Sequence, residues 1–431
     1  MRHKRILITA VCGLALAACS ESSASGGSGG AMTGDLKAEE FCTVEGLEAP
    51  LRQTFILVDD NMVNKTEDPR EFVALNANVR DVVLAVADPQ KALASGVTEA
   101  RERVSIFVLP SDGGAAERAF SGCLPGLSAD EMAQAKQESS ALGDFFTGGA
   151  SQKIENSVND FRMKLVASLQ YIARNAAGPA EAPDATIAEA SFIKSLRASN
   201  RLVSGDGGVP RVFLYTDVSQ MDFPKFTSQE EARAAGFADG KKIGLDFNRA
   251  DVFVILPEAG DDLIREYFQA FLLAQHARLA HWGGVNMGAV PIAPASVQRF
   301  VGKVQYPDSL ENVRLRIGVD KNGKLSDSWI ILEGTPDRST PMTGQAVCKS
   351  RGECNISSDS EGFAQAWSLA PGGEPEFDPD GPFGHMRRFE FNIDGKDLSG
   401  RIFDPAVDQI GSKSGNDSLT VEAVEIEGAT F

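Results

Sequence analysis

The sequence predicts an α/β fold, with a doubly wound, mostly parallel sheet, followed by a β-rich domain that forms a sandwich. Two observations lead to this prediction. Up to about residue 294, strand-like apolar runs alternate with segments of helical period, which is typical of a parallel sheet with helices on both faces. From about Ser296, apolar and polar residues alternate around short turns, which is typical of antiparallel hairpins.

The chain begins with an export signal. MRHKR supplies positive charge, Ile6–Ala18 is apolar but too short for a stable membrane anchor, and Leu16-Ala17-Ala18-Cys19 closes the stretch. This pattern resembles the lipobox of bacterial lipoproteins. The resemblance implies cleavage after residue 18, a diacylglycerol on the Cys19 sulfur and a fatty acyl chain such as palmitate on its amine. The alternative is an ordinary signal peptide, which would leave Cys19 as an exposed thiol.

Residues 19–35 hold the lipidated cysteine and a Gly/Ser-rich tether that has no apolar face. Ser20, in place of an aspartate, points to the outer membrane by the enterobacterial sorting pattern. We therefore expect a protein of the bacterial cell envelope that contacts the membrane only through its N-terminal lipid.

The chain is acidic, with 42 Lys+Arg against 60 Asp+Glu and a formal net charge of −18. Loss of residues 1–18 removes Arg2, Lys4 and Arg5 but no acid, which takes the charge from −18 to −21. Because this sign repels phosphate backbones and anionic headgroups, nucleic acid is not an expected partner.

Residues 36–294 form the expected α/β domain. Its strands are predicted at Thr54–Asp59, Val104–Pro110, Arg211–Thr216, Asp251–Leu256 and Val285–Val290. Helices are predicted after the N-cap Asp68, over the periodic apolar residues from Ile154 to Ile172, and after Asp261. The glycine-rich stretch near 111–150 is longer than an ordinary βα connection and is interpreted as an insertion.

Four cysteines remain in the exported chain once Cys12 and Cys19 are set aside, and they allow three disulfide pairings. Cys348 and Cys354 enclose a short charged loop, so we pair them with each other and pair Cys42 with Cys123. A zinc site is the competing use, but no CxxC or HxxxH spacing occurs.

Two strands of the α/β domain end on aspartates, in FILVDDNMV and in RVFLYTDVSQ. In this respect residues 45–294 resemble a divergent von Willebrand factor A domain, in which two such strand ends share a divalent cation. The resemblance implies a metal site at Asp59, Asn61 and Asp217, with Mg²⁺ or Ca²⁺ as the possible ion. Val63 stands where a hydroxyl ligand belongs, so the motif is degraded and a polar rim without metal is the favoured alternative.

Catalytic motifs are lacking in the sequence. HExxH, a Walker loop and GxGxxG after a strand are absent, and the GxSxG match GGSGG falls in the tether. His276 and His281, five residues apart in AQHARLAHWGG, are placed on a helix with their side chains on different faces, so packing is favoured over metal ligation. We therefore expect that this protein is not an enzyme.

Residues 295–431 form the expected antiparallel domain. Hairpin turns are predicted at Asn322-Gly323 and Asp394-Gly395. Glu374–His385 is acidic, but calcium binding there is not favoured. Trp329 and Trp367 are expected in the core rather than on a sugar-stacking surface.

Together these features predict an envelope lipoprotein that binds other envelope or surface proteins through the edge near Asp59, Asn61 and Asp217. The alternatives are a structural component of an envelope secretion or assembly apparatus and, less favoured, a glycan or peptide hydrolase that uses Asp59, Asp60 or the loop Glu376–Asp380.

Overall fold

The computed structural model contains two β-sheets in the residues that it describes. The residues that it describes are 36–44, 47, 49–127, 131, 150–178, 186–199, 202–203, 209–218, 221–257, 260–287, 292–306, 309–333, 338–363, 388–403 and 418–427. The lipobox and tether, the loop Glu374–His385, and Trp367 lie outside these residues, so the predictions made for them stay predictions.

The first sheet has seven strands in the order β1-β4-β3-β2-β5-β6-β7. The strands are β1 (Leu36–Ala38), β2 (Arg52–Asp59), β3 (Arg103–Leu109), β4 (Glu117–Cys123), β5 (Val209–Tyr215), β6 (Ala250–Ile255) and β7 (Ala277–Gly283). Five neighbouring strands of this sheet are mutually parallel, namely β3, β2, β5, β6 and β7. β4 pairs antiparallel with β3, and β1 is parallel to β4, so both run against the other five.

The sheet is therefore mixed, and the prediction of a doubly wound, mostly parallel sheet of the von Willebrand factor A type is wrong. The antiparallel strand β4 lies within the stretch that the sequence suggested was an insertion. The connection from β3 to β4 is too short to hold a crossover helix, so the chain turns back beside β3.

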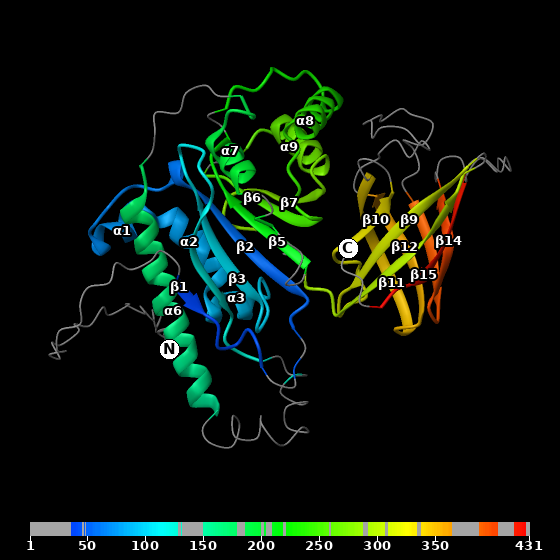
Figure 1. Ribbon diagram of the computed structural model, residues 1–431, viewed down its shortest axis with the longest axis horizontal. Coiled ribbons are helices and arrows are strands. Elements are labelled where there is room, and N and C mark those ends of the chain that lie inside the picture. The colour runs from blue at the N-terminus through cyan, green and yellow to red at the C-terminus, as the bar shows by residue number, and fades with distance from the viewer. Residues whose placement is uncertain are drawn as a thin grey trace, which may run out of the picture. The chain divides into compact units, whose positions relative to one another are not determined.

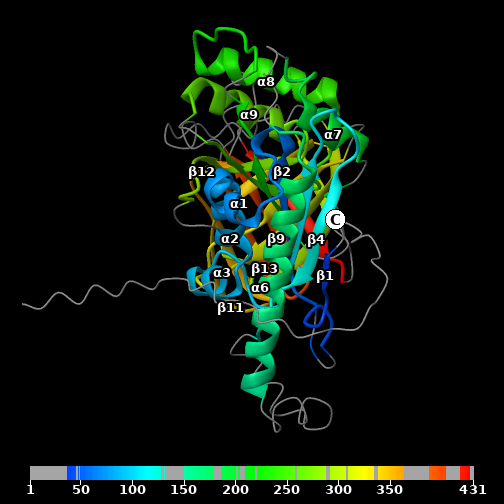
Figure 2. The same ribbon diagram turned by 90° about the vertical axis from the view of Figure 1, so that its left-hand side faces the viewer.

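The described residues form seven α-helices, and these cover both faces of the sheet (Figures 1 and 2). One face holds α1 (Pro69–Leu75), α2 (Ala77–Ala87), α3 (Pro89–Ser95) and α6 (Ala150–Asn175), and the other holds α7 (Ser191–Ala198), α8 (Gln229–Ile243) and α9 (Asp262–Leu273). Successive residues of β2 alternate between the two cores: Ile56 and Val58 pack in one, Phe55 and Leu57 in the other. Coverage on both sides explains why all eight residues of β2 are buried.

Local sequence signals start these helices as predicted. The Asp68 side chain accepts a hydrogen bond from the backbone N–H of Arg70, with Pro69 as the first helical residue. The Asp261 side chain accepts from the N–H groups of Leu263 and Ile264. The helical stretch Ile154–Ile172 is confirmed within α6.

The seventh strand was predicted wrongly. AQHARLAHWGG starts at Ala274, the C-cap that follows α9, and contains the strand β7, so it is not a helix that carries both histidines. His276 turns the chain between them with a positive φ of 53°, and His281 lies in β7. Of the predicted strand Val285–Val290, the structure describes residues 285–287, and these are not in a strand.

The second sheet is a closed antiparallel barrel, which overturns the predicted sandwich. Its strands are β8 (Ser296–Gln305), β9 (Leu310–Val319), β10 (Ser328–Leu332), β11 (Arg338–Ser350), β12 (Glu353–Phe363), β13 (Arg388–Asp394), β14 (Asp397–Phe403) and β15 (Ser418–Glu425). Alternation of apolar and polar residues predicts one buried face in either architecture. Pairing of the last strand β15 with the first strand β8 closes the barrel, and this long-range contact leaves no local signal.

The barrel interior is apolar. Along β13, Phe389, Phe391 and Ile393 are buried while the residues between them are exposed. Trp329 is 1% exposed, as expected for a core residue. Gly323 and Gly395 take positive φ angles of 79° and 65° in the two predicted hairpin turns.

Both predicted disulfides, Cys42–Cys123 and Cys348–Cys354, are present. In the described part of the chain, no helix has the length and apolar character needed to cross a membrane.

Candidate binding site at the carboxyl edge of the sheet

The ends of β2 and β5 bring together the polar residues that the sequence singled out. These strands are parallel neighbours, with Val58 opposite Tyr215. Asp59 is the last residue of β2, and Thr216 and Asp217 follow β5 directly. Because carboxyl ends of parallel strands meet at one edge, Asp59 and the Thr216-Asp217 pair lie at the same edge of the sheet, and Thr216 contacts Asp59 directly, while the metal site predicted there stays a prediction.

Asp59 is buried at this edge, with 4% of its surface exposed. Its Oδ2 accepts a hydrogen bond from the Thr216 hydroxyl at 2.7 Å, and its Oδ1 accepts one from the backbone N–H of Asn61 at 3.1 Å. The second bond caps the short 3₁₀-helix η1 (Asp60–Met62).

Burial raises the pKa of Asp59 to about 6, and this effect outweighs the hydrogen bonds from Thr216 and Asn61, which lower it. The negative charge of the neighbouring Asp60 raises the pKa of Asp59 further. Asp59 is thus a desolvated carboxyl group held by neutral donors, and its charge changes near neutral pH.

Asn61 links the edge to the helix α7. Its Nδ2 donates to the hydroxyl of Ser191, the first residue of α7, at 2.8 Å. Its Oδ1 is buried and has no hydrogen-bond partner among the described residues. Ser191 was not predicted, because it lies 130 residues away in the chain and a single serine at a helix start carries no recognisable signal.

Asp60 lies in a different environment from Asp59. It is 6% exposed, and its Oδ2 accepts from the backbone N–H of Ala177, just after α6, at 3.1 Å. Its Oδ1 has no hydrogen-bond partner in the described part of the molecule. The two adjacent carboxylates therefore contact different segments and do not form a face-to-face acid/base pair.

The donor set fits a cation poorly. Both Asp59 oxygens already accept hydrogen bonds, and Val63 is fully buried in the core below the edge, so it offers no ligand. Within the described ranges, no group of three or more His, Cys, Asp or Glu residues is arranged to hold a metal ion. Among the described residues, Asn61 Oδ1 and Asp60 Oδ1 are buried oxygens at this strand end that have no hydrogen-bond partner and could accept from an incoming group.

Asp217 is partly buried beside this set. Its charge is one cause of the raised pKa of Tyr215, after desolvation of the phenol. We use the name carboxyl-edge site for Asp59, Asn61, Ser191, Thr216 and Asp217.

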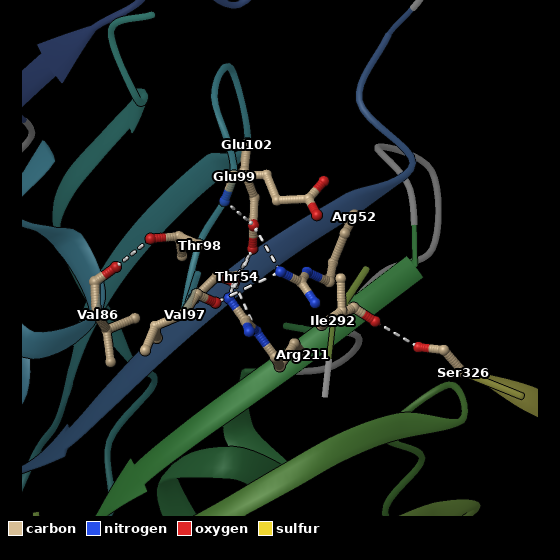
Figure 3. Close-up of polar contacts among 10 residues, drawn as sticks. All are labelled: Arg52, Thr54, Val86, Val97, Thr98, Glu99, Glu102, Arg211, Ile292 and Ser326. Carbon is tan, nitrogen blue, oxygen red and sulfur yellow. Dashed lines mark hydrogen bonds and ion pairs between the residues drawn. The ribbon is translucent and has the colours of Figure 1, made fainter. Parts of the chain in front are cut away.

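The opposite end of the same strands holds a buried ionic cluster that the sequence analysis missed. Glu102, which precedes β3 and is 1% exposed, accepts hydrogen bonds from Arg52 at 3.1 Å and from Arg211 at 2.9 Å (Figure 3). Thr54 donates to the same carboxylate, and the backbone N–H of Glu99 donates at 2.9 Å. The two arginines hold the pKa of Glu102 below its usual value despite the opposing effect of burial. The sequence feature that could have revealed this cluster is the presence of Arg52 and Arg211 in strands that are otherwise apolar.

The histidines do not contribute to the carboxyl-edge site. His281 Nε2 lies 2.9 Å from the carbonyl oxygen of Gly284, and His276 Nδ1 lies 3.4 Å from an oxygen of Asp246. The first contact is within the segment at the end of β7, and the second joins the start of β7 to the loop before β6.

Comparisons with known proteins give little support for any assignment. No family model matches the chain, and no curated protein matches it significantly. The crystal structure of the human COPII-coat protein Sec24c is similar with a TM-score of 0.27 and 8% identity, over 90% of this chain and 45% of that chain. The matched region thus spans less than half of that protein, and similarity at this level supports no conclusion about fold or function.

Proposed function

We propose that this chain is a lipid-anchored protein of the bacterial envelope that binds other envelope or surface proteins, without catalysis, through the carboxyl-edge site. The observation that carries the proposal is one buried oxygen, Asn61 Oδ1, which is unpaired among the described residues and lies next to the desolvated carboxyl group of Asp59. Asp59 is buried with neutral donors, and Asn61 Oδ1 is buried with no hydrogen-bond partner in the described residues.

Buried polar atoms in folded proteins are nearly always paired, so the unpaired Asn61 Oδ1 at the sheet edge favours a partner that brings the missing donor. The carboxyl edge of a parallel β-strand pair is also where ligands of open α/β sheets bind. The partner expected here presents N–H or O–H groups to Asn61 and Asp59.

The location rests on the N-terminal sequence. Leu16-Ala17-Ala18-Cys19 supports lipidation of Cys19, and the Gly/Ser-rich segment that follows supports a flexible connection to the membrane. The same features suit a structural component of a secretion or assembly apparatus, which would use the carboxyl-edge site in the same way.

The test is partner capture by the full-length lipidated protein. The variant Asp59→Asn/Asp217→Asn keeps the shape of both side chains but removes their charges. We expect crosslinked partner recovery from membrane extracts to fall by about tenfold, the effect of losing roughly 1.4 kcal/mol of binding free energy. Asp222→Asn, an exposed residue a few positions further along the chain, serves as the matched control.

Thermal unfolding followed by circular dichroism should show that both variants are folded. If the double variant captures the same partner as efficiently as the control, the interface lies elsewhere on the molecule and the proposal is wrong.

Hydrolysis is the second candidate, because an Asp59 pKa of about 6 suits acid/base chemistry at neutral pH. The separate environments of Asp59 and Asp60 weigh against a paired-carboxylate mechanism. Turnover of a glycan or peptide that disappears in Asp59→Asn but persists in Asp222→Asn would favour this candidate over binding.

A further inference from the structure

The two disulfides in the described residues differ in what they connect. Cys42 and Cys123 are 81 residues apart, whereas Cys348 and Cys354 are six apart at the tip of the β11–β12 hairpin. Cys348 and Cys354 are directly opposite each other in the strand register. In the chain-entropy account, a disulfide that closes a short loop restricts the unfolded chain less and contributes less stability.

The hairpin tip is held by other contacts as well. Strand pairing continues on both sides of the disulfide, with Val347 opposite Asn355 and Ser350 opposite Glu353. The backbone N–H of Gly395, in the neighbouring hairpin turn, donates to the carbonyl oxygen of Gly352 at 2.7 Å. Arg351 forms an ion pair of 3.1 Å with Glu425. The barrel therefore has little structural need for this disulfide.

The two sulfurs differ in accessibility. Cys348 is exposed on β11, next to Val347, which is 71% exposed. Cys354 is 3% exposed. A thiolate from solvent or from a partner therefore reaches the sulfur of Cys348 and not that of Cys354, which makes Cys354 the leaving group.

The residues around Cys348–Cys354 also suit the reduced form, in which both cysteines are thiols. Cys354 Sγ lies 3.3 Å from the carbonyl oxygen of Ser350. A disulfide sulfur has no proton to donate, but a Cys354 thiol can donate to this oxygen. Lys349 and Arg351 lie between the two cysteines in the loop, but each is ion-paired with a carboxylate, Lys349 with Glu353 and Arg351 with Glu425, so their charges are compensated and do not select the thiolate form. Contacts that stabilise the dithiol make a disulfide more readily reduced.

We propose that Cys348–Cys354 is a thiol–disulfide exchange site whose substrate is a dithiol, while Cys42–Cys123 is structural. A thiolate of the substrate attacks Cys348 Sγ, the Cys348–Cys354 bond breaks, and Cys354 leaves as a thiolate that takes up a proton. The second substrate thiol then attacks the mixed disulfide, loses its proton, and releases Cys348. Two electrons pass to the protein, and the substrate becomes a disulfide.

The experiment titrates the full-length protein in detergent with mixtures of reduced and oxidised dithiothreitol at pH 7. Free thiols are alkylated after quenching, and each cysteine is assigned by peptide mass spectrometry. We expect Cys348 and Cys354 to become half-alkylated at a dithiol-to-disulfide ratio at least about tenfold lower than Cys42 and Cys123 need. The β-sheet circular dichroism signal should not change across this first transition.

Two matched variants separate exchange from structure. Cys348→Ser/Cys354→Ser should melt within about 3 °C of the unmodified protein, whereas Cys42→Ser/Cys123→Ser should melt well below it. In Cys354→Ser, oxidised glutathione should form a mixed disulfide on Cys348. If the two disulfides open at the same ratio, or if opening Cys348–Cys354 unfolds the barrel, the site is structural and the proposal is overturned.

Discussion

The strand β2 lies between two buried carboxylates that behave in opposite ways. Beside its amino end, Glu102 faces Arg52 and Arg211 and has a lowered pKa. At its carboxyl end, Asp59 accepts hydrogen bonds from neutral groups and has a pKa raised to about 6. Both side chains are almost fully buried, and burial raises the pKa of each, so burial does not explain the difference between them. The difference comes from Arg52 and Arg211 beside Glu102, which have no counterpart beside Asp59 in the described residues.

The difference separates a structural site from a candidate functional one. Glu102 joins Arg52 of β2 and Arg211 of β5, and removing one member of such a cluster leaves buried charges without compensation. Asp59 has no comparable ionic contact within the described residues, and it lies next to the unpaired oxygen of Asn61. A buried carboxyl group without a cationic neighbour lowers the stability of the fold when it is ionised, and perturbed groups of this kind are typical of functional sites.

The largest expected effect comes from breaking the amino-end cluster. Glu102→Gln keeps the shape but leaves Arg52 and Arg211 without their shared carboxylate. We expect the free energy of unfolding to fall by about 3–5 kcal/mol in urea titrations at pH 7.

The control for this variant is Asp81→Asn, which breaks the exposed ion pair between Arg80 and Asp81. The control should change the free energy of unfolding by less than about 1 kcal/mol. Equal effects of the two substitutions would show that the Glu102 cluster does not hold the strands together.

A smaller effect, of opposite sign, is expected at the carboxyl end. Because the folded protein holds the Asp59 proton more tightly than the unfolded chain does, this group favours folding most below about pH 4. That contribution is lost as the pH rises from about 4 to about 6. Asp59→Asn should therefore stabilise the protein above pH 6, by up to about 3 kcal/mol, with no gain below pH 4.

Urea titrations of both proteins from pH 4 to pH 8 measure this difference. A variant that is less stable than the unmodified protein at pH 8 would mean that the ionised Asp59 is stabilised by its surroundings.

The smallest effect concerns the donor to Asp59. Thr216→Val removes the hydroxyl that lowers the Asp59 pKa, so that pKa should move further above 6. The free energy of unfolding should fall by about 1 kcal/mol. Carboxyl titration by NMR gives the pKa, and Thr216→Ser, which keeps the hydroxyl, should leave it close to 6. An unchanged pKa in Thr216→Val would exclude Thr216 as a significant donor.

Predictions from local pattern and predictions of long-range pairing fared differently. The apolar runs of β2, β3, β5 and β6 and the caps Asp68 and Asp261 were predicted correctly, because neighbouring residues decide them. β7 was mistaken for helix, since a strand with intermediate burial lacks a continuous apolar run. Antiparallel β4 was mistaken for part of an insertion.

The candidate site was predictable only in part. Asp59, Asn61 and Asp217 were found because each lies at or just after the end of an apolar run, and ends of parallel strands meet at one edge. Ser191, which bonds Asn61, and the ion cluster of Glu102 with Arg52 and Arg211 join residues 50 to 130 positions apart. No short-range pattern marks such contacts.

By itself, the sequence determined which segments form most strands and helices, which cysteines pair, and that the carboxyl end of β2 is acidic. Propensity, capping and periodicity act over a few residues and can be read directly from the chain. Tertiary structure alone decided that the second sheet closes into a barrel, that β1 and β4 oppose the other strands, and that Asp59 loses its solvent while Glu102 gains two arginines. Each of these outcomes depends on contacts between distant segments, and a carboxylate's charge in the folded protein depends on which groups those contacts bring to it.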